Sequence, residues 1–313
     1  MQGFALVLLP QIGVVTVTFN SGAVLDPFLQ CVFTQTQRSF LLFAVDNASN
    51  DDTLEILRRC GDDRLKTIAN PDNRGVAEGN NQGIRAALEA GCKFVLLLNN
   101  DTEFDATLFS RLEEGLEQHG TDMICPKMMY FDDPKRIWAA GGEFRPWLAY
   151  HITHSGGDEI DVGQYDRARL VTYVPTCCVL IKREVFEKVG LMDERYFVYG
   201  DDMDFMFRAN KAGIKLLYLP DAKLLHKVGR LTGGKASTFS LRWCTRNRIY
   251  FLLRHFGLMA STPMIVCYQF YFLARLLCGK LSFKAFRIKQ KAVWEGFTVW
   301  RRSSQARINQ CLL

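Results

Sequence analysis

Apolar and polar positions alternate in blocks over the first hundred residues. Four short apolar runs have the length and composition of strands: 13–19, 40–45, 64–69 and 93–98. The segment after the second run carries Leu54 and Leu57 at helical spacing, and another helix is predicted from Asn73 to about Ala90. Strands that alternate with helices predict βαβ units, and so an α/β fold with a mainly parallel central sheet.

Polar side chains follow the predicted strands. Asn20, Asp46, Asn73 and the run Asn99-Asn100-Asp101 each come where a strand ends. Ligands of open α/β sheets bind outside the carboxyl ends of the strands, so we expect these side chains to converge on one binding site. Asn99-Asn100-Asp101 suits Mg²⁺ or Mn²⁺, which often takes one or two protein carboxylates. The alternative for this run is a strand-to-helix turn with local hydrogen bonds.

Three carboxylates lie within four positions in the stretch 196–208, which is otherwise aromatic and apolar: Asp201, Asp202 and Asp204. Like charges this close raise one another's pKa. The stretch is predicted to be a loop that leads into a helix ending near Gly213. One Asp would suffice to cap that helix, so three favour a catalytic or ligand-holding role.

Glycines at 75, 79 and 83 do not form the dinucleotide fingerprint G-x-G-x-x-G, and the chain contains no G-x-x-x-x-G-K-[ST] motif. A P-loop NTPase is therefore excluded as far as a motif can exclude it. Spacing by four places these glycines on one face of a helix, which predicts either close helix packing or the shaping of a binding pocket.

The chain has 313 residues, enough for one large domain or two ordinary ones, and 48% of them are hydrophobic. Its ten cysteines are scattered, apart from Cys177-Cys178, without a CxxC motif, which supports neither zinc nor a disulfide framework and indicates a reducing compartment. Residues 1–17 are apolar but lack a basic leader, and Pro10 interrupts them, so we expect a lead-in to the first strand.

The net charge of +6 is unevenly placed, because no Asp or Glu lies between Asp221 and Glu295. This basic segment predicts a polyanionic neighbour: substrate phosphates, an anionic membrane or nucleic acid. A non-enzymatic nucleic-acid-binding protein would leave the acidic cluster at 201–204 unexplained, so we expect no nucleic acid. A sugar nucleotidyltransferase should carry a Gly-rich, Arg-containing loop after the first strand, where this chain has Phe19-Asn-Ser-Gly22.

Together, the motifs between about residues 12 and 250 resemble those of family 2 glycosyltransferases, closest to the bacterial rhamnosyltransferase-like branch. They occur in the family's order: VDNASND at 45–51, NRGVAEGNNQG at 73–83, LNNDT at 98–102, VGLMD at 189–193, YGDDMD at 199–204, then Arg208, Gly213, Pro220 and His226. The resemblance implies a GT-A fold, with a catalytic domain over 1–240 and a helical region over 241–313. It also implies inverting transfer of a sugar from a nucleoside diphosphate.

By position, the resemblance implies that Asp46 contacts the nucleotide base and that Asp101 holds the metal on the diphosphate. Asp202 would be the general base, with Asp201 beside it where the family more often has Glu. Asn99 stands where the family often has Asp. Asn20, Asn73 and Asn99, at the ends of the predicted strands, are expected to contact the donor. On the resemblance, the donor is dTDP-rhamnose or another dTDP- or UDP-sugar. The expected acceptor is a glycan or a polyprenyl-diphosphate-linked glycan.

Three further residues have two interpretations each. His226 is predicted to ligate the metal from the opposite wall, and the alternative is a core histidine. Arg208 is a candidate for holding a donor phosphate, but it lies four residues after Asp204, where a helical ion pair is the favoured role. Arg230, within the basic, glycine-containing segment 226–235, is predicted to fold over the donor diphosphate, and the alternative is a solvated surface loop.

The C-terminal region combines aromatic, apolar and basic residues. Residues 264–277 are apolar but short for a membrane span, which needs about 20 residues, so an interfacial helix is expected. Beyond them, aromatic rings are interleaved with Lys and Arg at 275, 280, 284, 287, 289, 291, 301, 302 and 307, against Glu295 alone. This pattern predicts a peripheral protein on the anionic cytoplasmic face of the plasma membrane. The alternative is a helix packed on the catalytic domain with a solvated basic face.

Overall fold

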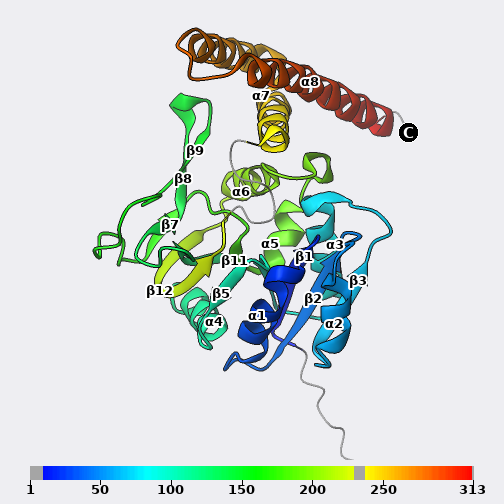
Figure 1. The fold of residues 1–313 in the computed structure, drawn as a ribbon, viewed down its shortest axis with the longest axis vertical. Helices are drawn as coiled ribbons and strands as arrows, with labels where there is room; N and C mark the ends of the chain where they lie inside the picture. Colours follow the sequence, from blue (N-terminus) through cyan, green and yellow to red (C-terminus); the bar gives the residue numbers. More distant parts are fainter. Residues whose placement is uncertain (1–9, 229–236, 312–313) are drawn as a thin grey trace, which may run out of the picture.

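The computed structural model describes residues 10–228 and 237–311. A central sheet is flanked by helices, and two long helices stand at one end of the molecule (Figure 1). Residues 1–9, most of the expected lead-in, lie outside the described residues.

The first hundred residues form the four predicted strands and the two predicted helices, together with α1, which was not predicted. Their bounds are β1 (Ile12–Thr18), α1 (Gly22–Phe33), β2 (Phe40–Asp46), α2 (Thr53–Arg59), β3 (Leu65–Ala69), α3 (Gly75–Glu89) and β4 (Phe94–Leu98). Every residue of β4 is buried, as its continuous apolar run predicts. A Cβ on Gly79 would lie 2.9 Å from the Val17 side chain, and one on Gly83 would lie 2.3 Å from that of Val15. These two glycines therefore let α3 pack closely on β1.

The remaining elements extend the sheet and cover it. They are β5 (Thr102–Phe104), α4 (Leu108–Gln118), β6 (Met123–Tyr130), β7 (Ile137–Ala139), β8 (Gly142–Arg145), η1 (Pro146–Leu148), β9 (His151–His154), β10 (Arg169–Val171), β11 (Cys178–Lys182), α5 (Arg183–Val189), η2 (Glu194–Tyr196), α6 (Asp201–Lys211) and β12 (Leu216–His226). α6 begins at the acidic cluster, and Gly213 follows it with a φ of 74°, as expected of a glycine after a helix end.

The main sheet has the order β10-β12-β6-β11-β4-β1-β2-β3, with β5 paired to β12 and β7 to β6. β4, β1, β2 and β3 are mutually parallel, and β6 is parallel to β12, as predicted for the α/β part. β11 runs antiparallel between β4 and β6, so the sheet is mixed. The carboxyl ends of β1, β2 and β4 therefore meet at one edge.

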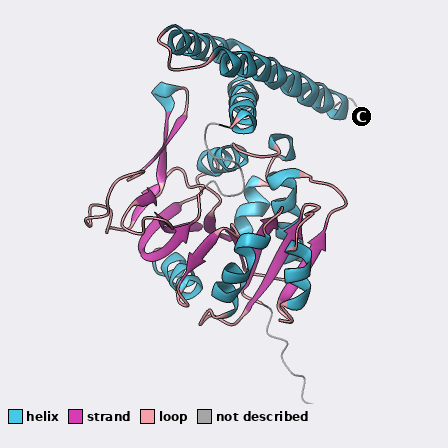
Figure 2. Cartoon of the chain, in the orientation of Figure 1, coloured by secondary structure: helices cyan, strands magenta, loops and turns pink. Residues whose placement is uncertain are grey.

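The C-terminal helices are α7 (Thr238–Leu277) and α8 (Phe283–Cys311). Figure 2 shows that this end of the molecule is built mainly from helices. Gly257 interrupts α7 with a φ of 72°, so α7 consists of two helical halves joined at a kink. By length and composition alone, α7 could cross a membrane, although 39% of its most apolar window is buried inside the protein. The expected interfacial segment 264–277 is thus part of the second half of α7.

Candidate active site

The polar residues after β1 and β2 form one hydrogen-bonded edge. Asp46 is fully buried, and its carboxylate accepts hydrogen bonds from the Thr18 hydroxyl and from the backbone N–H and hydroxyl of Ser49. Asn20 is exposed, and its Oδ1 accepts from the backbone N–H of Asn50 at 2.8 Å. Asn20 and Asp46 therefore lie near each other, as expected from the sequence. The Asp46 carboxylate, however, mainly stabilises the 46–49 turn through hydrogen bonds.

Asn73 and Asn99 are both exposed at the same edge. The Asn73 Oδ1 accepts a hydrogen bond from the backbone N–H of Gly75 at 2.9 Å and so fixes the entry to α3. Asn100, next to Asn99, is buried and donates from Nδ2 to the Val17 carbonyl at 2.7 Å, which ties the end of β4 to β1. Asn99 is therefore the amide of this run that faces solvent.

Asp101 and His226 lie side by side, because Asp101 directly precedes β5 and His226, at the end of β12, pairs with Thr102 of β5. The Nε2 of His226 lies 3.3 Å from Oδ1 of Asp101, and both side chains are about nine-tenths buried. Burial lowers the pKa of His226, but Cys177 and Asp101 outweigh it and raise that pKa to about 10.

One carboxylate and one imidazole, aimed at a common point, fit Mg²⁺ or Mn²⁺ when phosphate oxygens supply other ligands. No group of three or more His, Cys, Asp or Glu suited to a metal occurs among residues 10–228 and 237–311. A metal at this place would therefore depend on the donor. It would also have to displace the proton of His226, since a metal binds the neutral imidazole.

Asp201 and Asp202 occupy the first turn of α6, where the helix dipole favours negative charge. Asp201 is buried, and burial together with the charge of Asp202 raises its pKa to about 7. Asp202 is half-buried, and its Oδ2 accepts a hydrogen bond from the Tyr173 hydroxyl at 2.5 Å. Burial raises the pKa of Asp202, whereas the Tyr173 hydroxyl lowers it. Asp202 is thus the more accessible carboxylate of the pair.

A row of rings joins the Asp101–His226 pair to Asp202. The ring centroids of His226 and Trp138 lie 4.3 Å apart, those of Trp138 and His154 lie 5.5 Å apart, and those of His154 and Tyr173 lie 5.6 Å apart. Tyr173 then reaches Asp202. The expected metal ligands and the expected base therefore lie along one aromatic wall. No local sequence pattern predicts Trp138, His154 or Tyr173 as part of it.

The loop before Asp201 has an uncommon backbone. Phe197 and Tyr199 have φ angles of 62° and 61°, in the left-handed region that is costly for side chains of this size. Asn247, fully buried on α7, donates from Nδ2 to the carbonyls of Tyr196, Val198 and Tyr199 at 2.9, 2.8 and 2.6 Å. The motif Thr245-Arg-Asn-Arg248 thus holds the loop that presents the carboxylates.

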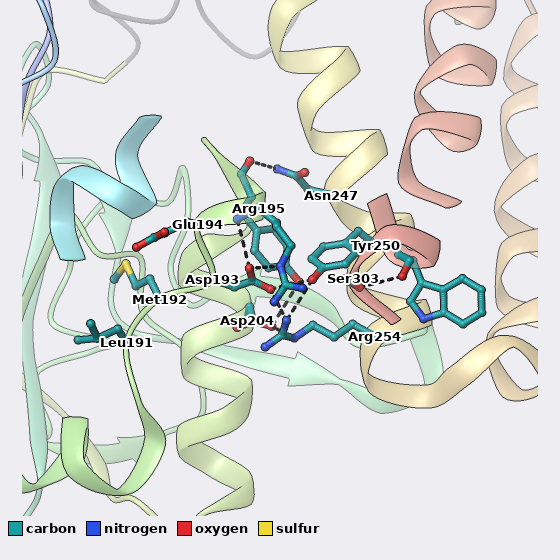
Figure 3. A network of polar contacts seen from close by, with 12 residues as sticks. Leu191, Met192, Asp193, Glu194, Arg195, Asp204, Asn247, Tyr250, Arg254 and Ser303 are labelled. Carbon is teal, nitrogen blue, oxygen red and sulfur yellow. Dashed lines mark hydrogen bonds and ion pairs between the residues drawn. The ribbon is translucent and has the colours of Figure 1, made fainter. Parts of the chain in front are cut away.

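Asp204 belongs to a separate buried network that joins α6 to α7 (Figure 3). Its carboxylate contacts Nε of Arg208 at 2.7 Å, Nε of Arg254 at 3.2 Å and Nε2 of His255 at 2.7 Å. Burial raises the pKa of Asp204, but these partners outweigh it and lower that pKa to about 2. Arg254 also contacts Asp193, which accepts from the Tyr250 hydroxyl at 2.8 Å.

Arg208 does not point toward the donor edge. Its guanidinium donates to Asp204 and to the carbonyls of Val189 and Leu191 at 2.7 and 2.8 Å. The structure therefore shows the helical ion pair that the spacing favours, in which a cation near the buried Asp204 compensates its charge. Arg230 and the rest of 229–236 lie outside the described residues, as does most of the expected basic loop.

The sequence profile of glycosyl transferase family 2 matches residues 13–190. An N-acetylglucosaminyl-diphospho-decaprenol L-rhamnosyltransferase of Mycobacterium tuberculosis is 26% identical over 269 residues, which cover 78% of this chain and 85% of that protein. The dTDP-rhamnosyl transferase RfbF of Shigella flexneri is 24% identical, with 62% of each chain covered. These relatives agree with the expected rhamnosyltransferase-like branch.

Two solved structures share the fold. GalNAc-T7, in a crystal structure with UDP, GalNAc and Mn²⁺, has a TM-score of 0.60 and 18% identity over 78% of this chain, which spans half of that protein. The mannosyltransferase PcManGT of Pyrobaculum calidifontis, with GDP-Man and Mn²⁺, has a TM-score of 0.55 and 14% identity, with 96% and 76% covered. The predicted GT-A fold is confirmed, and the chain belongs to glycosyl transferase family 2 and is a glycosyltransferase.

Proposed function

We propose that this glycosyltransferase moves a sugar, with inversion, from a nucleoside diphosphate to a hydroxyl of a lipid-linked glycan. The observation that carries the proposal is the placement of Asp202, half-buried at the start of α6 and fixed by Tyr173. Rhamnose from dTDP-rhamnose is the donor that we favour, since two relatives are named as rhamnosyltransferases.

The chemistry needs one base and one site for the leaving group. Asp202 takes the proton of the acceptor hydroxyl while the acceptor oxygen forms a bond to the anomeric carbon of the donor sugar. The bond from that carbon to the diphosphate oxygen breaks on the opposite face. Asp201, with its raised pKa, keeps negative charge from accumulating beside the base. A divalent cation held by Asp101 and His226 supplies Lewis acidity to the diphosphate when bound.

Exposed amides at the ends of the parallel strands suit the donor. Asn20, Asn73 and Asn99 are exposed there, and Asp46 orders the turn between them. We assign nucleotide contacts to this edge, and we do not retain Arg208 as a phosphate ligand because its guanidinium is paired with Asp204.

We also propose a division of labour along the chain. Residues 1–240 bind the donor and carry the base, whereas 241–313 dock on the cytoplasmic face of an anionic membrane, where a lipid-linked acceptor would be found. The relative in Mycobacterium tuberculosis is named for a decaprenol-linked acceptor. The first half of α7 connects the two parts, because its Asn247 donates a hydrogen bond to the loop that precedes Asp201.

Asp202→Asn tests the proposed base. The substitution keeps the size of the side chain and removes its basicity, so we expect transfer to fall by about 10²–10⁴-fold. Donor binding, followed by thermal shift with Mn²⁺ over a panel of nucleotide sugars, should be unchanged. A ligand at 100 times its Kd stabilises the fold by about 2.7 kcal/mol, so the same panel identifies the donor. Retention of more than a tenth of the wild-type turnover would exclude Asp202 as the base.

A further inference from the structure

The hairpin formed by β8 and β9 ends in an exposed apolar tip. At this tip, the short helix η1 presents Trp147, which is 72% exposed, and Leu148, which is 56% exposed. The guanidinium of Arg145 lies 5.4 Å from the Trp147 ring centroid. An aromatic ring, an aliphatic side chain and a cation side by side are the combination that favours a membrane interface.

The tip is held in place rather than left loose. Arg248 of α7 donates to the carbonyls of Leu148, Ala149 and Tyr150, the last at 3.0 Å. Ala149 and Tyr150 have φ angles of 53° and 59°, in the costly left-handed region. The ring of Tyr150 stacks on Phe256 with centroids 4.7 Å apart. Contacts from α7 thus hold a strained turn that keeps Trp147 and Leu148 in solvent.

The tip lies beside the kink of α7. Phe256, which stacks on Tyr150, directly precedes Gly257, and the next residues, Leu258 and Met259, are 48% and 92% exposed. Figure 1 shows the hairpin rising from the sheet toward the end of the molecule where α7 and α8 lie. The exposed tip is therefore continuous with the proposed docking region.

The other end of the hairpin lies at the proposed base. The Gly142 carbonyl accepts from the backbone N–H groups of Thr172 and Tyr173 at 3.2 and 3.0 Å, and Tyr173 contacts Asp202. From Gly142 to Trp147 the chain advances three residues along β8, at about 3.3 Å each, and two residues into η1, at about 2.0 Å each, which gives roughly 14 Å. The hairpin thus fixes a distance between its tip and the catalytic edge.

We propose that Trp147 and Leu148 enter the interface of the same anionic bilayer on which α7 and α8 dock. The protein would then touch the membrane at two places, one on each part of the chain. This inference rests on the proposed membrane acceptor. It adds that the reacting hydroxyl must stand roughly the length of the hairpin, about 14 Å, beyond the plane of the tip. The acceptor class is accordingly a lipid with an extended headgroup.

Tryptophan quenching tests the contact directly. Full-length protein is mixed with vesicles of phosphatidylglycerol and phosphatidylcholine, with and without bromine on the acyl chains. We expect brominated vesicles to quench the wild type, and the quenched fraction to drop in Trp147→Phe. Trp243→Phe is the matched control, because Trp243 stacks on Phe197 within the protein with centroids 4.8 Å apart. Equal quenching of wild type and Trp147→Phe would overturn the proposal.

Flotation supplies a second measurement. Trp147→Ser with Leu148→Ser should weaken binding to these vesicles about tenfold or more, since two apolar side chains no longer enter the interface. Ile160→Ser with Val162→Ser, which removes two exposed apolar side chains from another loop, should not weaken it. Unchanged flotation of the Trp147/Leu148 variant, or weakening confined to the control, would refute the inference.

Both measurements use binding alone, without turnover. Failure of the proposed transfer reaction, as read from Asp202→Asn, is therefore distinguishable from failure of the membrane contact. Circular dichroism and the Tm of the Trp147 and Leu148 variants should match those of the wild type, because these two side chains are exposed. If Trp147 instead contacts the glycan, brominated lipid will leave it unquenched, which would also overturn the proposal.

Discussion

At Asp202, burial and hydrogen bonds act on the pKa in opposite directions. Burial disfavours the carboxylate and raises its pKa, and the Tyr173 hydroxyl favours the carboxylate and lowers it. A general base works best when its pKa lies near the working pH. Tyr173 is therefore a positioning residue that also sets the pH at which the base becomes available.

Tyr173→Phe should move the acidic limb of the kcat profile to higher pH. The Tyr173 hydroxyl favours the ionised carboxylate, so the loss of its hydrogen bond raises the pKa of Asp202 further above its ordinary value. Activity should fall most below neutral pH and recover as pH rises. Tyr130→Phe, which removes a hydroxyl from Asp158 in another loop, is the control. A uniform loss at all pH values would indicate a merely structural role.

Removal of the divalent cation should weaken donor binding. Asp101 and His226 are the two candidate ligands, and Asp101→Ala should reproduce the effect of a chelator, with a fall in nucleotide-sugar affinity of about tenfold or more. Asp105→Ala, a nearby exposed carboxylate, serves as the control. If affinity is indifferent to chelator, the Asp101–His226 pair is structural, and cations such as Arg230 and Lys235 must neutralise the diphosphate.

At the scale of elements, helical geometry separates carboxylates that are neighbours in the sequence. Side chains two positions apart on a helix point to nearly opposite faces, so Asp202 faces Tyr173 while Asp204 faces Arg208 and Arg254. In the sequence, Asp201, Asp202 and Asp204 form one acidic cluster with no sign of this separation. Only the ion pair of Asp204 with Arg208 is predictable from the sequence, because it depends on a local spacing of four.

Contacts between residues distant in the sequence could not be predicted from local sequence patterns. The strands and helices of the first hundred residues follow from apolar periodicity, and their polar ends follow from parallel pairing. β11 was not predicted to run antiparallel, because pairing direction depends on neighbours distant in the chain. Tyr173 and Asn247 reach the catalytic loop from 29 and 48 residues away or more, and only the fold brings them there.

Asn247→Ala should disturb the position of the proposed base Asp202 and leave the donor site unchanged. Three carbonyls of the loop 196–199 would lose their buried donor, which costs roughly 1–3 kcal/mol, and the left-handed Phe197 and Tyr199 would lose support. We expect a lower Tm and a kcat reduced more than tenfold, with donor affinity retained because the donor edge lies on other elements. Thr298→Ala, on the exposed face of α8, is the control. Equal loss of kcat and donor affinity would contradict this separation.

At the scale of the whole molecule, the kink at Gly257 separates two environments. The first half of α7 carries the buried polar residues Arg246 and Asn247 and the half-buried Arg254, which contact the catalytic part, so this half cannot lie in a bilayer. The second half packs on α8, and together they line an apolar groove of about 540 Å³ that includes Phe270, Leu273 and Trp294.

Peripheral docking fits this pair of helices better than a span. From Leu258 to Leu277 the second half of α7 has the length of a span, about 30 Å. Its partner α8, however, begins with Lys284, Arg287 and Lys291 exposed, and charges at the centre of a bilayer are costly. Exposed Phe270, Leu277, Phe283 and Trp294 beside those cations suit the interface instead.

Charge reversal on the helices should release the protein from vesicles. The variant replaces four exposed cations by Glu: Lys280, Lys284, Arg287 and Lys291. Each Lys or Arg near an anionic surface contributes about 1 kcal/mol, so losing four weakens partitioning by roughly 10³-fold, and salt should weaken the wild type in the same direction. Flotation with phosphatidylglycerol vesicles measures the effect.

The control reverses four exposed cations of the catalytic part, which the docking proposal leaves away from the membrane: Arg58, Lys66, Lys135 and Lys188. This variant has the same net charge as the first, so a purely global electrostatic attraction would affect both equally. Because the proposal places the contact on α7 and α8, we expect the control to float as the wild type does. Equal release of the two variants would refute docking through this surface. Wild-type protein that resists extraction at high salt, as a protein with a spanning helix does, would refute it as well.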